Sequence, residues 1–186
     1  MNIPNVLTII RLFLVPVFML VYSIDSGDFK VRLAAAAVFI IASATDVLDG
    51  YIARKYNKIT DFGKLADPVA DKLMQLSVIG CLAFDDRISM WILVVFAFKE
   101  LVLILGGLNL LKEKFVVQSK WSGKIATAIL FLCIIVILVT DSSQLSKFQC
   151  TLMMSVSLCF TAIAFFDYMS MFIRVKDKMQ KSKEKK

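Results

Sequence analysis

The sequence contains no histidine, so it offers no imidazole for catalysis or metal binding. A Ser-His-Asp triad is therefore excluded, and a general base must be a carboxylate, lysine, tyrosine or cysteine. Cysteine occurs only at Cys81, Cys133, Cys150 and Cys159, with no CxxC spacing. We interpret these residues as small hydrophobic side chains, and not as a zinc site or a disulfide framework.

Hydrophobic residues are abundant, at 59% of the 186 residues, and the mean hydropathy is +0.76. Soluble domains average about 45–50% apolar residues. The excess lies in long blocks, which favours a lipid bilayer over a large aqueous core. The sequence therefore predicts an all-α integral membrane protein with one compact domain.

Each of the apolar blocks approaches the ~20 residues that a helix needs to cross the hydrocarbon core. We expect six transmembrane helices, at about 6–24, 33–53, 65–83, 88–111, 122–140 and 148–173. Together they form a predicted catalytic domain at residues 1–175, which a basic cytoplasmic tail follows at 176–186.

The formal net charge is +7, and the lysines and arginines lie between the apolar blocks and in the tail. This distribution is typical of the cytoplasmic face of a membrane protein and argues against nucleic-acid binding. Positive residues gather in 54–64, 112–124 and the tail, and the opposite side has only Lys30, Arg32, Arg87 and Lys147. We therefore expect the 54–64 loop and both termini to face the cytoplasm.

Four aspartates lie where the second and third predicted spans meet the 54–64 loop. Asp46 and Asp49 are three residues apart and Asp67 and Asp71 are four apart, so each pair shares one helix face. Helices joined by a short loop are antiparallel neighbours, so the four carboxylates can converge. Like charges this close repel one another unless a cation binds between them. Oxygen ligands without His or Cys favour Mg²⁺, Mn²⁺ or Ca²⁺ over zinc.

The residues between the aspartates suit a phosphate ligand. Gly50 and Gly63 permit close approach of a ligand, and Arg54 can grip a phosphate oxygen. An oxygen-ligated metal site at the membrane interface fits phosphoryl chemistry on a lipid, and Asp71 is the candidate proton acceptor. The alternative is that the acids are interfacial charges that pair with neighbouring basic residues, namely Arg54, Lys55, Lys64 and Lys72.

The segment from Asp46 to Asp71 follows the pattern DxxDGxxAR, eight residues, GxxxDxxxD at every fixed position. This pattern resembles the signature of the CDP-alcohol phosphatidyltransferase family. The opening NIPNVLTIIR is similar to the start of bacterial members of that family. The resemblance implies the family's fold, which agrees with the six predicted spans.

The resemblance also implies roles for particular residues. It makes Asp46, Asp49, Asp67 and Asp71 the ligands of Mg²⁺ or Mn²⁺, with Asp71 also accepting a proton. The residues expected to bind CDP-diacylglycerol are Gly50, Arg54 and Thr60. It implies a homodimeric enzyme among the lipids of the plasma membrane, with its active site facing the cytoplasm. The expected reaction transfers a phosphatidyl group from CDP-diacylglycerol to glycerol 3-phosphate and releases CMP.

The acceptor side departs from the pattern of members that use glycerol 3-phosphate. These members usually have an Arg-Glu pair in the fourth span and GKxKT at the start of the fifth. Here the matching residues are Lys99-Glu100 and Gly123-Lys124-Ile125-Ala126-Thr127. Lys120 and Lys124 are candidates for binding the acceptor phosphate, or are ordinary positive-inside residues. Lys99-Glu100 is either a substrate contact or a buried ion pair that holds helices together.

Two alternative functions follow from these departures and from the acids. Phosphatidylglycerol or another alcohol can be the acceptor of the same chemistry, and phosphatidylglycerol would give cardiolipin. A metal-ion transporter is an alternative from a different class, since intramembrane acids often mark ion paths. Against a transporter, all four aspartates lie at one end of their helices and none continues a path across the membrane.

Overall fold

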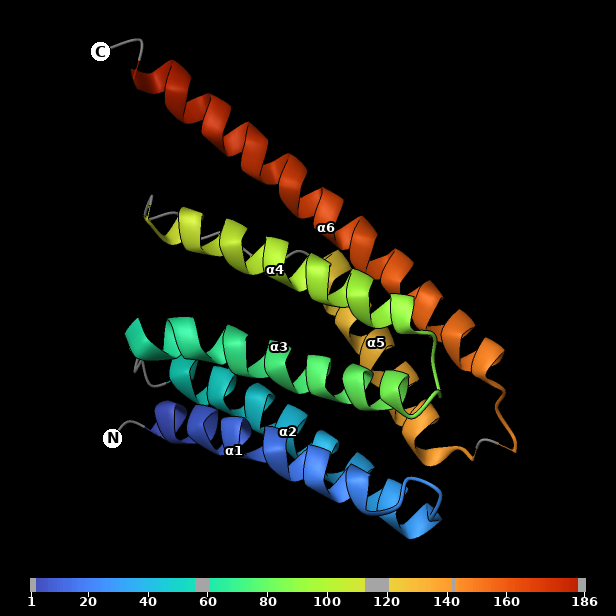
Figure 1. Ribbon diagram of the computed structural model, residues 1–186. Helices are drawn as coiled ribbons and strands as arrows, with labels where there is room; N and C mark the ends of the chain where they lie inside the picture. Colours follow the sequence, from blue (N-terminus) through green and yellow to red (C-terminus); the bar gives the residue numbers. More distant parts are fainter. Residues whose placement is uncertain (1–2, 56–60, 113–120, 142, 184–186) are drawn as a thin grey trace.

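The computed structural model of the protein is all-helical over the residues that it describes (Figure 1). The backbone is described for residues 3–55, 61–112, 121–141 and 143–183, and side chains for 6–48, 69–103, 123–141 and 143–166. The helices are α1 (Ile3–Ile24), α2 (Phe29–Lys55), α3 (Asp61–Phe84), α4 (Met90–Lys112), α5 (Trp121–Val139) and α6 (Lys147–Lys183).

The prediction of an all-α membrane protein is confirmed, and the six helices lie close to the six predicted spans. Within the described residues, three stretches are long and apolar enough to cross a membrane: Val6–Ile24, Phe29–Leu48 and Lys147–Phe166. Gly123–Val139 is a shorter apolar helix. Helix α6 continues to Lys183, so its backbone shows no break where the sequence predicts the tail to begin.

Capping residues explain where two of the helices begin. The side chain of Asp28 accepts a hydrogen bond of 2.9 Å from the backbone N–H of Lys30, which caps α2. At the start of α6, the backbone N–H of Ser146 donates to Oε1 of Gln149 at 2.9 Å. The backbone N–H of Gln149 donates in return to Oγ of Ser146 at 3.4 Å. This reciprocal pair is a capping box and fixes the first turn of α6.

Consecutive helices run in opposite directions, so alternate connectors lie at opposite ends of the bundle (Figure 1). The connectors 25–28, 85–89 and 140–146 (without residue 142, which the structure does not describe) lie together at one end, which we call the connector end. Both termini lie at the other end, toward which α2 ends and α3 begins. We call it the aspartate end, because Asp46 and Asp71 lie in the halves of α2 and α3 that are nearer to it.

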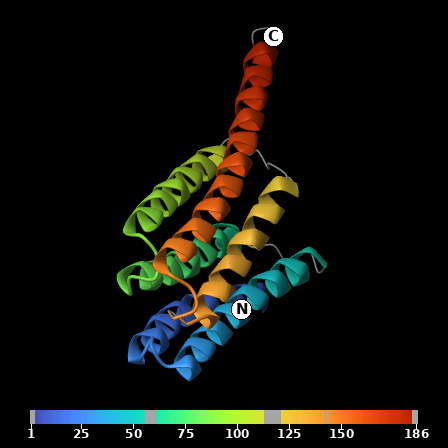
Figure 2. The ribbon, with the colours of Figure 1, turned by 90° about the vertical axis from the view of Figure 1, so that its right-hand side faces the viewer.

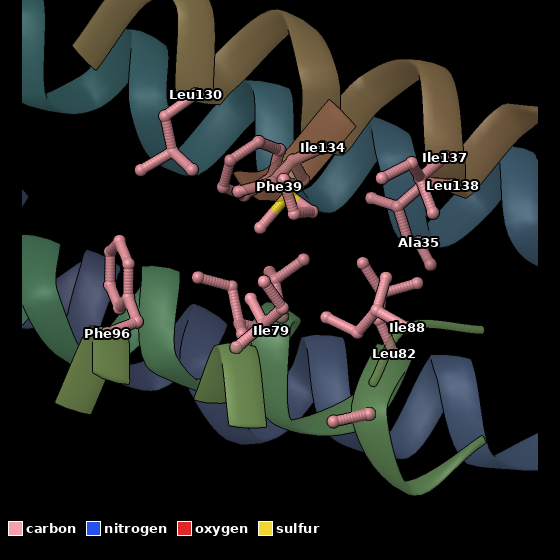
Figure 3. Close-up of a cluster of buried hydrophobic side chains, with 14 of the residues drawn as sticks. Ala35, Phe39, Ile79, Leu82, Ile88, Phe96, Leu130, Ile134, Ile137 and Leu138 are labelled. Atoms are coloured by element: carbon pink, nitrogen blue, oxygen red, sulfur yellow. The ribbon is translucent and has the colours of Figure 1, made fainter. Parts of the chain in front are cut away.

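Helix α1 packs against α2 and α3, α4 packs against α3, and α5 packs against α2 and α6. The ribbon seen from the side in Figure 2 shows α6 extending beyond the other helices. Side chains of α2, α3 and α5, such as Phe39, Ile79 and Ile134, are at most 2% exposed and meet in the centre (Figure 3). Because lipid tails are themselves apolar, close packing and not exclusion of water is the main stabilisation of such a core.

Large apolar side chains also cover the outside of the bundle. Phe13, Leu20, Phe98 and Phe166 are each at least 67% exposed. Exposed apolar area on this scale marks a surface that contacts membrane or protein. In a chain with these apolar spans, lipid is the natural neighbour.

Arg87 closes the connector end on the α5 side. Its side chain is buried, and Nη2 donates to the carbonyl oxygens of Ile137 at 3.1 Å and Thr140 at 2.5 Å. Carbonyl groups in the last turn of a helix have no partner within the helix, so Arg87 satisfies groups that burial would otherwise leave unpaired. The preceding residue, Asp86, has a φ of 59°, a left-handed conformation that aspartate tolerates in turns.

Asp85 and Arg32 close the same end on the α1 and α2 side. The carboxylate of Asp85 accepts hydrogen bonds from the hydroxyl groups of Tyr22, at 2.8 Å, and Ser26, at 2.9 Å. Arg32 is buried, donates to the carbonyl oxygen of Ser26 at 3.1 Å, and lies 3.7 Å from the carboxylate of Asp141. Asp85, Arg32 and Arg87 thus each have partners within the fold.

Candidate active site

Asp46 of α2 pairs with a basic residue of α1. Its Oδ1 lies 3.2 Å from Nη1 of Arg11, whose side chain is only 1% exposed, whereas that of Asp46 is 42% exposed. A guanidinium buried this deeply is stabilised by a negative partner, and Asp46 is one such partner. Arg11 belongs to the opening segment that resembles the family, but the sequence did not single it out as a site residue.

Asp71 of α3 faces the same region. The amide of Gln75, one turn later, donates to Oδ2 of Asp71 at 3.1 Å. The ammonium of Lys72 lies 4.0 Å from the same oxygen. The charges of Asp46 and Arg11 lie near enough to act on the Asp71 carboxylate. Helices α1, α2 and α3 therefore bring a guanidinium and two carboxylates together.

Glu100 of α4 adds a third acid behind Asp71. It is 1% exposed, and its Oε1 lies 2.7 Å from the ammonium of Lys99. Its Oε2 lies 3.3 Å from the ammonium of Lys72 on α3. The ammonium of Lys99 also lies 4.3 Å from the centre of the Phe96 ring, a cation–π contact. Lys99-Glu100 is thus a buried ion pair that extends to α3.

An apolar groove of about 600 Å³ separates α4 from α6. Its wall includes Trp91, Phe98 and Lys99 from α4, and Leu158 and Phe165 from α6. Neither Asp46 nor Asp71 lines it, so this groove is not the site of the predicted chemistry.

Several predicted site residues lie outside the described side chains. For Asp49, Gly50 and Arg54 in α2, and for Asp67 in α3, the structure describes the backbone but not the side chain. Thr60 and Lys120 lie outside the described residues altogether. Among the described side chains, no group of three or more His, Cys, Asp or Glu forms a metal cluster. The predicted four-aspartate site therefore stays a prediction.

The candidate acceptor residues on α5 lie in different surroundings. Lys124 is exposed near the start of the helix. Ala126, which stands where the family pattern has its second lysine, is 2% exposed and packs inside the bundle. A lysine at this position would not reach an open site without rearrangement. Only Lys124 of this stretch therefore offers a charge to an acceptor.

The donor groups that the structure describes suit a hard divalent cation. Asp46 and Asp71 supply carboxylate oxygens from two helices, and the side chain of Asp71 keeps 30% of its surface exposed. Carboxylate oxygens are the preferred ligands of Mg²⁺ and Mn²⁺.

Comparison with known proteins places this chain among lipid-synthesising enzymes. The model of the CDP-alcohol phosphatidyltransferase family matches residues 1–169. A relative from Bacillus subtilis, named CDP-diacylglycerol–glycerol-3-phosphate 3-phosphatidyltransferase, is 38% identical over 136 residues, which cover 68% of this chain and 70% of that protein. A probable phosphatidylglycerophosphate synthase of Mycobacterium tuberculosis is 30% identical over 174 residues, covering 93% of this chain and 82% of its own.

A third relative shares more identity over a shorter segment. The Rickettsia bellii protein with the same name as the Bacillus one is 50% identical over 80 residues, which cover 43% of this chain and 41% of that protein. The family match spans nearly the whole bundle and includes the complete signature from Asp46 to Asp71. This chain therefore belongs to the CDP-alcohol phosphatidyltransferase family and is a membrane enzyme of that class.

Proposed function

We propose that this enzyme transfers the phosphatidyl group of CDP-diacylglycerol to sn-glycerol 3-phosphate, which gives phosphatidylglycerophosphate and CMP. The observation that carries this proposal is the complete signature on α2 and α3, in a chain whose relatives are named for this reaction. The position of Asp71 near Asp46 and Arg11 supports it, because acids and a guanidinium are the groups that such chemistry needs.

Four aspartates are the proposed ligands of Mg²⁺ or Mn²⁺: Asp46, Asp49, Asp67 and Asp71. Their carboxylates fit such an ion by donor chemistry, and the two whose side chains are described come from neighbouring helices. When bound, the cation neutralises the pyrophosphate of the donor and stabilises the charge that develops on departing CMP.

Asp71 is the proposed proton acceptor. The acceptor's hydroxyl oxygen attacks the lipid-bearing phosphorus of CDP-diacylglycerol, the bond from that phosphorus to the CMP oxygen breaks, and CMP leaves with the bonding electrons. The hydroxyl proton passes to the Asp71 carboxylate. The hydrogen bond from Gln75 holds this carboxylate in one orientation, so Gln75 has a positioning role.

Residues at the aspartate end would bind the rest of the two substrates. Gly50, Arg54 and Thr60 are proposed contacts of the CDP-diacylglycerol head group. Lys120 and Lys124 are proposed contacts of the acceptor phosphate. The excess of positive residues at this end supports a cytoplasmic orientation in the plasma membrane. We also propose that the enzyme is a homodimer, because members of the family commonly are.

The test is an acceptor panel with purified protein, CDP-diacylglycerol and Mg²⁺ or Mn²⁺. Glycerol 3-phosphate, phosphatidylglycerol, inositol phosphate and serine are compared by CMP release, and lipid products are identified by mass spectrometry. We expect CMP release with glycerol 3-phosphate and a product that carries two acyl chains. Release of CMP only with another alcohol would contradict the assignment of the acceptor.

Phosphatidylglycerol is the second candidate acceptor. The buried Ala126 favours it, because the stretch opening α5 offers one lysine fewer to a phosphorylated acceptor than the family pattern does. In the same panel, a product with four acyl chains would identify this activity.

A further inference from the structure

Glu100 is the most deeply buried acid among the described side chains, and an ammonium group lies within ion-pair distance of each of its oxygens. Lys99 holds Oε1 at 2.7 Å and Lys72 holds Oε2 at 3.3 Å. Lys99 is a neighbour on α4, whereas Lys72 comes from α3 and directly follows Asp71. The carboxylate therefore joins α4 to the part of α3 that carries the proposed catalytic acid.

Lys72 is placed between two carboxylates and sits closer to Glu100. Its ammonium is 3.3 Å from Glu100 and 4.0 Å from Asp71. Among the described side chains, Asp71 is the other carboxylate within ion-pair distance of this ammonium. A lysine that pairs directly with Asp71 would compete with any cation that needs the same oxygens.

We propose that Glu100 is a positioning residue that holds the ammonium of Lys72 away from Asp71, so that Asp71 stays available to a divalent cation. This inference rests on the proposed function only in taking Asp71 as a ligand of that cation. It does not depend on the identity of the acceptor alcohol.

Lys99 makes this arrangement possible. An acid that is 1% exposed within a helical bundle is costly unless it is paired. Lys99 neutralises Glu100, and its own position is fixed by the Phe96 ring. Glu100 is therefore not an isolated buried charge, and its second oxygen can hold the ammonium of Lys72.

Two measurements on Glu100→Gln test the proposal. The first is the Mg²⁺ concentration that gives half-maximal CMP release. The second is the rise in melting temperature of the detergent-solubilised protein with Mg²⁺, which reports binding without turnover. We expect the Mg²⁺ concentration for half-maximal CMP release, and the concentration for half of the full melting shift, each to rise by roughly three- to tenfold. The reason is that one partly buried ion pair must break before the cation binds.

The second-site variant Glu100→Gln/Lys72→Met separates this role from a structural one. Removal of the competing ammonium should return the Mg²⁺ requirement to within about twofold of the wild type, because the two residues act through one contact. If the pair only held α3 to α4, the double variant would remain at least as impaired as Glu100→Gln. That result overturns the proposal, as does an unchanged Mg²⁺ requirement in Glu100→Gln.

Lys72→Met alone covers the case in which Glu100→Gln does not fold. The proposal predicts that its Mg²⁺ requirement equals or falls below that of the wild type. A several-fold increase would mean that Lys72 assists the site, and it would overturn the proposal. The matched control is Asp85→Asn, which removes an acid at the connector end and should leave the Mg²⁺ requirement unchanged.

The melting experiment also shows which claim has failed, the role of Glu100 or the assignment of the acceptor. Failure of the wild type to release CMP with glycerol 3-phosphate would remove the acceptor assignment but leave the Mg²⁺ melting shifts to be compared. Equal melting shifts in the wild type and Glu100→Gln would remove the role of Glu100, whatever the acceptor.

Discussion

The two ends of the bundle carry charged residues in different arrangements. At the connector end, Arg87 donates to carbonyl groups at the end of α5, and Asp85 accepts from two hydroxyl groups. At the aspartate end, Asp46 and Asp71 have ionic neighbours but keep 42% and 30% of their side-chain surfaces exposed. The two ends therefore differ in the kind of partner and not in exposure, since Asp85 and Asp86 are exposed as well. Hydrogen bonds to hydroxyl and carbonyl groups of the fold prevail at the connector end, and ion pairs between neighbouring helices prevail at the aspartate end.

This difference suggests how to separate structural from functional charges in a membrane bundle. A buried charge whose donors or acceptors are satisfied within the fold stabilises the fold. An acid that remains partly exposed beside other acids raises the energy of the unliganded protein, and a cation relieves that cost. Substitutions at the connector end should therefore change stability, and those at the aspartate end should change turnover.

The largest expected effect is that of Asp71→Asn on turnover. Loss of the proton acceptor should lower the rate of CMP release by about 10²–10⁴-fold, the usual contribution of a general base. The amide keeps the shape of the side chain, so helix content and elution volume should match the wild type. Circular dichroism and size-exclusion chromatography provide that check, and Asp85→Asn is the matched control. Substantial activity in folded Asp71→Asn would show that this carboxylate is not the base.

A smaller effect, on stability, is expected from Arg87→Met. This change leaves the carbonyl oxygens of Ile137 and Thr140 without their donor, which should cost about 1–3 kcal/mol. We expect a lower melting temperature in detergent and an unchanged Mg²⁺ requirement for the protein that remains folded. A changed Mg²⁺ requirement with an unchanged melting temperature would contradict the claim that charges at the connector end stabilise the fold and do not act in turnover.

The smallest effect is expected from Tyr22→Phe. The variant loses one hydrogen bond to Asp85, worth about 0.5–1.5 kcal/mol, and Ser26 still donates to the same carboxylate. A small fall in melting temperature with normal CMP release is the predicted result. If CMP release fell markedly, Tyr22 would have a role in turnover that its position at the connector end does not explain.

The sequence predicted the helical membrane fold well because hydrophobic blocks of this length have few other structures available. It also identified the segment from Asp46 to Asp71, because helical spacing and the family signature agree there. The end of α6 was less predictable: charge marked residues 176–186 as a tail, but helix α6 continues to Lys183. Composition sets where the hydrocarbon ends, and it does not determine where helical hydrogen bonding stops.

The partners of the acids were harder to predict from the sequence. The alternative interpretation paired the acids with neighbouring basic residues, whereas among the described side chains Asp46 pairs with Arg11 on α1. Lys72 was one of the basic residues of that alternative, and it lies nearer to Glu100 than to Asp71. These contacts depend on how α1 and α4 pack against α2 and α3, and spacing along a single helix carries no information on that packing.

The most direct test of the central claim is a metal titration of CMP release by the wild type and Asp46→Asn. Both proteins are treated with chelator, supplied with CDP-diacylglycerol and glycerol 3-phosphate, and titrated with Mg²⁺ or Mn²⁺. We predict that the wild type is inactive until the cation is added, and that Asp46→Asn stays folded but is not restored. CMP release by the chelated wild type, or an identical titration curve for Asp46→Asn, would contradict a metal-dependent site at the aspartate end.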